Sequence, residues 1–194
     1  MTTRLTVLTL LILVPVASYA QATNPAETLR ARKQYRNTLA VFKEPQIFPA
    51  LSKAEIYRVF IVPTFRHPIS IRIERTRTGY VLFAKALSGQ GGYKWGRLNR
   101  RTQRRLTQTE WRGLVDLLTA ASFWTLPSND EESKPDEKGA VTVCLDGTSW
   151  YLEGVKGRTY QAVDRYCPAS KNFKAIGLYM LNLSGLRIPE SDVL

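Results

Sequence analysis

The densest positive charge in the sequence is a run of five arginines, Arg97, Arg100, Arg101, Arg104 and Arg105. Guanidinium groups bind phosphate and carboxylate well, so the run is a candidate anion-binding surface. If the segment is a strand, alternation places Arg97, Arg101 and Arg105 on one side and the other two on the opposite side. The alternative is a solvated edge strand, whose positive charge blocks pairing with other chains.

A glycine-rich segment over residues 88–96 precedes this run and holds Tyr93 and Trp95 between its glycines. It could cradle an anion, and its rings could stack on a ligand or lie at a headgroup boundary. It lacks the spacing and the closing Lys-Ser/Thr of a phosphate-binding loop. The simpler interpretation is a flexible connector.

Acid–base chemistry has one candidate, the carboxylates of Glu153 and Asp164. A two-residue turn at Lys156-Gly157 would place Glu153 beside Tyr160 and Asp164 opposite Ser149. Two carboxylates on neighbouring strands could act as general acid and base, and the chain would then be an unrecognised hydrolase. Cross-strand ion pairs and hydrogen bonds explain the same residues without catalysis. The single histidine, His67, has no catalytic set around it, and we expect neither a metal site nor a cofactor.

The chain has two cysteines, Cys144 and Cys167. In an oxidising compartment such a pair can form a disulfide, worth on the order of 3 kcal/mol for a loop of this length. The bond cannot form if the two residues lie on strands separated by a third, because their Cα atoms would then be more than about 7 Å apart. The sequence leaves both outcomes open.

Residues 1–20 have the features of a cleavable secretory signal peptide. Arg4 gives a positive start, an uncharged apolar run follows, and small residues mark a cleavage site after Ala20. Cleavage after Ala22 fits nearly as well. A membrane anchor is the alternative, but a spanning helix needs about 20 apolar residues and this run is shorter. We therefore expect a periplasmic or secreted protein whose mature form has no transmembrane span.

The formal net charge of +12 bears on partners and solubility rather than on fold. Outside the cytoplasm the available polyanions are lipid headgroups, lipopolysaccharide and acidic glycans, and we do not expect nucleic acid as a partner. A protein that is simply basic is the alternative. The sequence does not indicate an oligomeric state.

The elements that position these residues form a single α+β domain over residues 53–194, after an N-terminal arm over 21–52 that we expect to be mobile. Alternation from Ile69 to Glu74, followed by a turn and a returning strand, predicts a hairpin. A capping box at Thr107 begins an amphipathic helix. Ser170 can cap a last apolar helix that ends near Gly185.

Three more strands are predicted between the two helices, over residues 140–145, from 148, and over 159–166. Asp146-Gly147 and Lys156-Gly157 supply two-residue turns. The first turn places Val143 opposite Trp150. The predicted fold is therefore an antiparallel sheet, a hairpin plus a three-stranded meander, with two main helices packed on one face.

The second half of the chain carries a set of short motifs, Ser122-Phe123-Trp124, Asp146-Gly147, Trp150-Tyr151-Leu152-Glu153-Gly154 and Val163-Asp164-Arg165, with Pro168 before the last helix. With these motifs, residues 107–189 resemble a family of uncharacterised exported bacterial proteins. The resemblance implies a periplasmic or secreted protein and carries no activity. Taken together, we expect a non-enzymatic, envelope-associated binding protein, with the unrecognised hydrolase as the alternative.

Overall fold

The computed structural model describes residues 25–48, 54–128 and 144–194, with side chains from Gln34 onward. The signal peptide predicted over residues 1–20 lies outside the described residues. The chain divides into two compact units, one up to Tyr35 and one from Arg36 to Leu194. The first unit holds the beginning of helix α1 (Pro25–Phe42), and the second holds everything that follows here.

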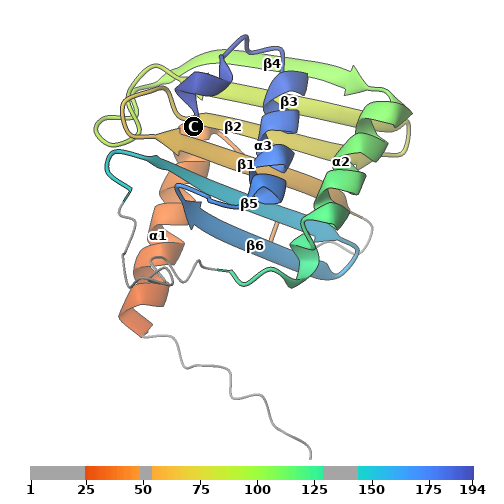
Figure 1. Cartoon of the computed structure of the whole chain (residues 1–194), viewed down its shortest axis with the longest axis horizontal. Coiled ribbons are helices and arrows are strands. Elements are labelled where there is room, and N and C mark those ends of the chain that lie inside the picture. Colours follow the sequence, from red (N-terminus) through yellow and green to blue (C-terminus); the bar gives the residue numbers. More distant parts are fainter. Residues whose placement is uncertain (1–24, 49–53, 129–143) are drawn as a thin grey trace, which may run out of the picture. The chain divides into compact units, whose positions relative to one another are not determined.

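The second unit is built on a six-stranded antiparallel sheet with the strand order β4-β3-β2-β1-β5-β6 (Figure 1). The chain is therefore an α+β protein, as predicted. Consecutive strands are neighbours except at one point, where β5 returns beside β1. The bounds are β1 Glu55–Pro63, β2 Ile69–Thr76, β3 Gly79–Leu87, β4 Leu98–Leu106, β5 Thr148–Lys156 and β6 Thr159–Tyr166.

The apolar core lies between the sheet and two helices, α2 (Gln108–Ala120) and α3 (Lys171–Leu183), which cover the same face (Figure 1). The alternation of β2 decides which face this is, because Ile69, Ile71 and Ile73 all point into the core and are fully buried. The helices contribute Trp111, Leu114 and Leu118 from α2 and Phe173, Ile176 and Met180 from α3.

Both helices begin at the predicted caps. Glu110 N donates to Thr107 Oγ1 at 3.2 Å, and Thr107 N donates back to Glu110 Oε2 at 2.7 Å, which completes the capping box. Ser170 Oγ accepts from Phe173 N at the start of α3. Gly185 follows the end of α3 with φ of 70°, a left-handed conformation that glycine adopts without strain.

The opposite face of the sheet is covered by the last turns of α1 and by the segment after it. Leu39, Phe42 and Ile47 are buried there, and the Phe42 ring lies 5.4 Å from the ring of Phe60. The compact unit therefore begins at Arg36, well before the boundary predicted at residue 53. Pro45 does end regular structure, but a segment without regular structure can still be buried.

The predicted pairing of the first meander strand with β5 is wrong. Trp150 of β5 lies opposite Ile61 of β1 on one side and opposite Arg165 of β6 on the other. Both edges of β5 are therefore occupied by described strands. Residues 140–143 lie outside the described part, and 144–147 form no strand. The pairing with β1 joins distant parts of the chain, which a local hairpin signal at Asp146-Gly147 cannot reveal.

The predicted turn between β5 and β6 is also displaced. Lys156 pairs with Thr159, so Gly157-Arg158 forms the turn instead of Lys156-Gly157. Glu153 consequently lies opposite Ala162, and Asp164 lies opposite Tyr151. Gly157, with φ of 60°, takes the left-handed position that this turn requires.

Candidate functional site

The arginine run does not form one surface. Strand β4 lies at the sheet edge, where β3 is its only strand partner in the described sheet, and Arg97 precedes it. Alternation along the strand turns Arg100 and Arg104 toward the helices, and Arg101 and Arg105 toward the other face. A candidate anion site on this strand can therefore use at most part of the run.

Arg100 and Arg104, with Thr102 between them, bind the C-terminal end of α3. Arg104 Nε donates to the carbonyl oxygen of Leu183 at 2.8 Å, and Arg100 Nη1 donates to that of Leu186 at 2.9 Å. The last carbonyls of a helix lack partners within the helix and carry partial negative charge. Part of the run thus stabilises a helix end, a structural role that was not predicted.

Arg104 has a second partner in the capping box of α2. Its Nη2 lies 2.8 Å from Glu110 Oε1. The hydrogen bond from Arg104 is the largest cause that lowers the pKa of Glu110 below its ordinary value, and the bonds from Thr107 add to it. Arg104 is therefore held between two elements and is not available as a free anion contact.

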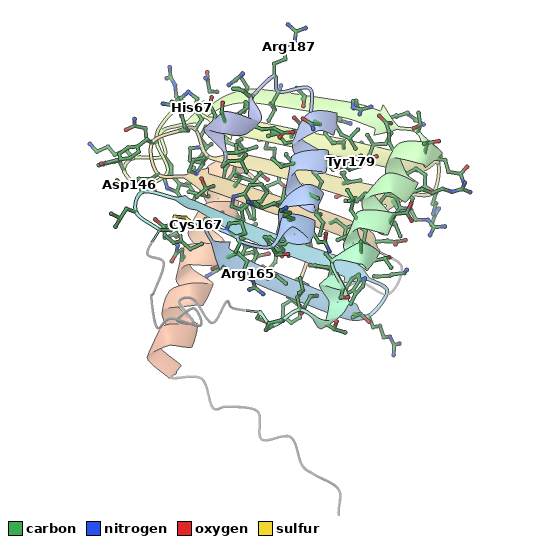
Figure 2. All side chains as sticks on the ribbon, viewed as in Figure 1. His67, Asp146, Arg165, Cys167, Tyr179 and Arg187 are labelled. Carbon is green, nitrogen blue, oxygen red and sulfur yellow. A yellow bond between two sulfur atoms is a disulfide. The ribbon has the colours of Figure 1, made fainter. Side chains whose placement is uncertain are left out.

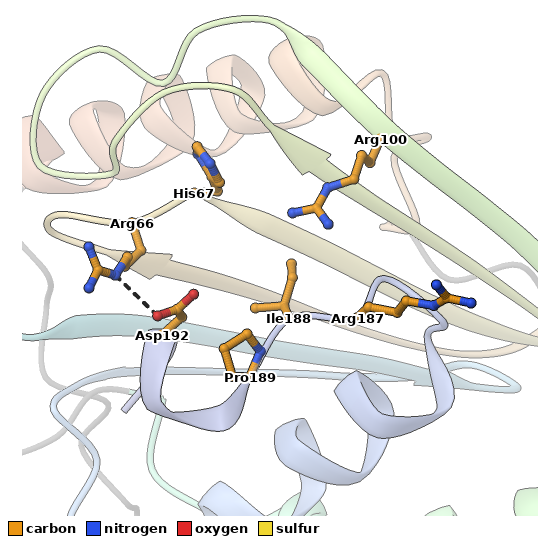
Figure 3. A pocket seen from close by; sticks show the side chains of 7 residues that line it. All are labelled: Arg66, His67, Arg100, Arg187, Ile188, Pro189 and Asp192. Carbon is orange, nitrogen blue, oxygen red and sulfur yellow. Dashed lines mark hydrogen bonds and ion pairs between the residues drawn. The ribbon is translucent and has the colours of Figure 1, made fainter.

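Arg100, in contrast, lines a small pocket (Figure 3). The pocket has a volume of about 80 Å³. Sites for drug-sized ligands start at roughly 300 Å³, so this pocket suits only a small ligand such as a small anion. Cationic or ionisable side chains dominate the lining, and Asp192 is the one carboxylate among them. The lining residues are Arg66, His67, Arg100, Arg187, Ile188, Pro189 and Asp192.

Two contacts fix the side chains around this pocket. Arg66 Nε pairs with Asp192 Oδ1 at 3.1 Å, and 62% of the Arg66 side chain remains exposed. His67 Nδ1 lies 2.8 Å from the carbonyl oxygen of Gly89. Because a carbonyl only accepts, His67 Nδ1 carries a hydrogen in this contact. Arg187 directs its guanidinium outward (Figure 3).

The pocket adjoins a group of three loops that we call the loop end of the sheet, residues 64–68, 88–97 and 144–147. Gly91 N donates to Pro63 O at 3.0 Å, and Thr64 N donates to Gly147 O at 3.1 Å, so the loops are bound to one another. Figure 2 shows His67, Asp146 and Cys167 together at this end.

The glycine-rich loop is closely packed and is not a loose connector. A Cβ atom on Gly91 would lie 2.3 Å from Pro63 O, so the backbone of this loop can approach β1 only through glycine. Trp95 also turns inward: its Nε1 donates to Gly91 O at 2.7 Å, and its ring lies 6.1 Å from that of Phe42. Of the two rings predicted to meet a ligand, only Tyr93 remains exposed.

Cys144 and Cys167 form a disulfide with Cα atoms 6.4 Å apart. Neither cysteine lies within a strand, so no intervening strand holds the two residues apart. The bond ties the 144–147 loop to the end of β6. Cys167 N donates to Thr148 O at 2.9 Å, which closes the same corner.

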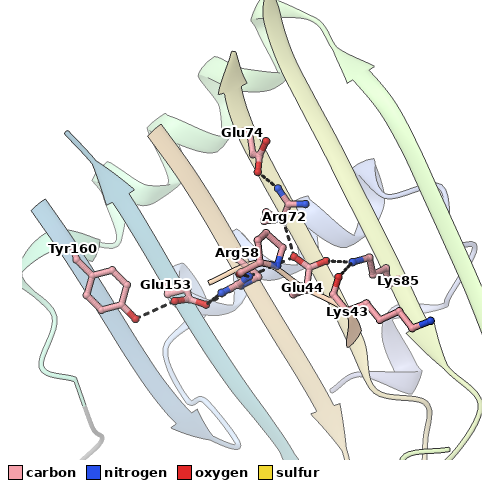
Figure 4. Close-up of polar contacts among 9 residues, drawn as sticks. Lys43, Glu44, Arg58, Arg72, Glu74, Lys85, Glu153 and Tyr160 are labelled. Atoms are coloured by element: carbon pink, nitrogen blue, oxygen red, sulfur yellow. Dashed lines mark hydrogen bonds and ion pairs between the residues drawn. The ribbon is translucent and has the colours of Figure 1, made fainter. Parts of the chain in front are cut away.

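Glu153 belongs to a buried network of charges on the sheet face away from α2 and α3 (Figure 4). Arg58 Nε donates to Glu153 Oε1 at 2.7 Å, and both side chains are fully buried. Tyr160 OH donates to Glu153 Oε2 at 2.9 Å. Glu153 is fully buried against Arg58 and Tyr160, whereas Asp164 is exposed, so the two carboxylates of the predicted pair do not share a solvent-accessible site.

Glu44 links this network to the segment after α1. Its Oε2 lies 2.7 Å from Arg72 Nε and 3.4 Å from Arg58 Nη1, and its Oε1 lies 2.5 Å from Lys85 Nζ. Burial is the main cause that raises the pKa of the neighbouring Tyr151 to about 12, with the charge of Glu153 next. Paired charges of this kind can hold a segment in register, and the network is buried at Glu44, Arg58 and Glu153 and partly exposed at Lys85.

No family model and no curated protein matches the chain. Over the described ranges, no helix is long and apolar enough to cross a membrane. The same part of the chain contains no group of three or more side chains able to hold a metal ion.

Proposed function

We propose that this protein is exported to the periplasm or secreted, and that it acts there as a non-enzymatic binding protein on anionic components of the cell envelope. The contact surface is the pocket beside the loop end. The observation that carries the proposal is the gathering of Arg66, His67, Arg100 and Arg187 around a pocket whose one lining carboxylate is Asp192. Of the five arginines first considered, only Arg100 belongs to this surface.

The chemistry of these side chains favours phosphate and carboxylate ligands. Arg100 Nη1 is held by Leu186 O, and this bond leaves the other guanidinium hydrogens to a ligand. Arg66 and Arg187 lie at the exposed rim, where they attract anions mainly through their charge. Contacts of this exposed kind are screened over about 8 Å at physiological ionic strength, so binding should depend strongly on salt.

Export is supported by two independent features. The first is the predicted signal peptide. The second is the disulfide between Cys144 and Cys167, because such bonds persist in oxidising compartments and are rare in the cytosol.

The test is binding to vesicles of phosphatidylglycerol against neutral vesicles of phosphatidylcholine, at low and at physiological salt. We expect retention on the anionic vesicles that weakens steeply as salt rises. Replacing Arg66, Arg100 and Arg187 by Gln should weaken binding about a hundredfold, since each basic residue near an anionic surface contributes about 1 kcal/mol.

The matched control replaces Arg77, Arg112 and Arg158 by Gln, which removes the same charge from exposed positions away from the pocket. It should bind nearly as the parent does. Circular dichroism and thermal unfolding check that both variants are folded. Equal losses in the two variants would mean that net charge alone acts, and absence of salt-dependent binding by the parent would end the proposal.

A further inference from the structure

Three of the seven large apolar side chains that remain exposed in the described residues lie on the loops of the loop end. Phe65 is 43% exposed, Tyr93 66% and Leu145 81%, and each comes from a different one of the three loops. At the other end of the sheet, the turns at 76–79 and 156–159 themselves expose no large apolar side chain, and the one exposed ring beside them, Phe48, packs on the Tyr160 ring at 4.8 Å. An exposed apolar group on a soluble fold marks a contact surface when several such side chains lie together.

The loop end holds these side chains outward through a rigid backbone. The Phe65 and Tyr93 rings lie 5.9 Å apart, and Gln90 Nε2 donates to Phe65 O between their loops. Gly92 N donates to Thr64 O at 2.9 Å. Leu145 directly follows Cys144, which the disulfide fixes. The three side chains therefore do not depend on a ligand to take these positions.

Positive charge lies directly beside the apolar side chains. Arg66 follows Phe65 and Lys94 follows Tyr93 in the sequence, and both are exposed. The basic pocket adjoins them through Arg66. Rings and aliphatic side chains flanked by cations fit the boundary of an anionic bilayer, where acyl chains lie directly below the phosphates.

We propose that the loop end docks on an anionic phospholipid bilayer, with Phe65, Tyr93 and Leu145 inserted at the headgroup boundary and the pocket contacting lipid phosphate. This rests on the proposed function and names its partner. A soluble acidic glycan would match the cations but would offer nothing to Leu145, which is the most exposed of the three. A bilayer satisfies both kinds of side chain.

The first test replaces Phe65 and Leu145 by Ser, against a control with Ser at Phe48 and Val41, exposed apolar positions outside the loop end. At physiological salt the loop-end variant should bind phosphatidylglycerol vesicles at least tenfold more weakly than the parent, whereas the control should bind within twofold of it. Both are checked for folding by circular dichroism.

The second test measures insertion directly and does not depend on those variants. Tyr93→Cys carries an environment-sensitive fluorophore, and Arg158→Cys carries it as the control, with the native disulfide verified by mass spectrometry. We expect a blue shift and quenching by lipids spin-labelled in the upper acyl chain at position 93 only.

Two results separate the inference from the proposed function. In the first case, the Phe65 and Leu145 variant binds like the parent and the label at position 93 stays in water, but the arginine variant loses binding. Insertion is then wrong, and anion binding by the pocket stands. If the parent binds acidic glycans as tightly as vesicles and the Ser variant leaves both unchanged, the partner is a glycan. If the parent binds no anionic surface, both proposals fail.

Discussion

The two ends of the sheet are built from the same strands but differ in what they expose. At one end, the turns at 76–79 and 156–159 are short and present polar side chains. At the loop end, segments 64–68, 88–97 and 144–147 bind one another and hold large apolar side chains in solvent. Arginines occur at both ends, so charge alone does not distinguish them. The proposed contact surface is the end where hydrogen-bonded loops keep apolar and cationic side chains together.

The largest expected effect on stability comes from removing the disulfide at the loop end. Replacing Cys144 and Cys167 by Ser should lower the free energy of unfolding by about 3 kcal/mol, the value expected for closure of a loop of this length. Denaturant unfolding of the parent, with and without reductant, measures the effect. A change below about 1 kcal/mol would mean that the 144–147 corner is held by its hydrogen bonds instead.

A pair of glycine substitutions compares the two ends directly. Gly91→Ala places a Cβ atom 2.3 Å from Pro63 O, and we expect a loss of about 1–3 kcal/mol from the overpacking. Gly157→Ala meets nothing within 4 Å and suffers only from its left-handed backbone, worth about 1 kcal/mol. Thermal unfolding of the two variants gives the order. Equal losses would show that the 88–97 loop can move away from β1.

Gly91→Ala should also weaken vesicle binding, because a shifted loop moves Tyr93. Gly157→Ala should leave binding unchanged. Because both variants gain one methyl group, the comparison distinguishes an effect on vesicle binding from an effect on stability alone.

The smallest effect concerns the ion pair at the start of α2. The hydrogen bond from Arg104 lowers the pKa of Glu110. The ionised Glu110 side chain therefore adds to the free energy of unfolding above the ordinary glutamate pKa, and this stabilisation is lost as the pH falls through the lowered pKa. The pair is partly exposed, and we expect it to contribute less than about 1 kcal/mol. Glu110→Gln should unfold at a lower temperature than the parent at neutral pH. The difference in unfolding temperature between the variant and the parent should disappear in acid. A difference that does not change with pH would contradict the assignment of the stabilisation to the charge of Glu110.

Local signals in the sequence predicted the elements whose cause is local. The capping residues Thr107 and Ser170 mark the starts of α2 and α3, and alternation in β2 identifies the buried face. Strand β6 has the predicted bounds. These features depend on neighbours a few residues apart, which a single sequence displays.

Features that depend on distant partners could not be predicted in the same way. Val59 of β1 pairs with Leu152 of β5, and no spacing in the sequence announces that pairing. The pocket brings Arg66 together with Arg100 and Arg187 from three separate segments. Arg58 and Glu44 are charged residues in or beside apolar segments, which is a weak signal of a buried ion pair. The sequence does not show that the two residues are partners, because that depends on the fold.

The most direct test of the account is amide hydrogen exchange of the unmodified protein, with and without phosphatidylglycerol vesicles. We expect slower exchange in the peptides that cover 64–67, 89–97, 145–147 and 186–192 when vesicles are present. The turns at 76–79 and 156–159 should exchange at the same rate in both conditions. Protection at those turns, or exchange at the loop end that vesicles leave unchanged, would contradict the assignment of the loop end as the binding surface.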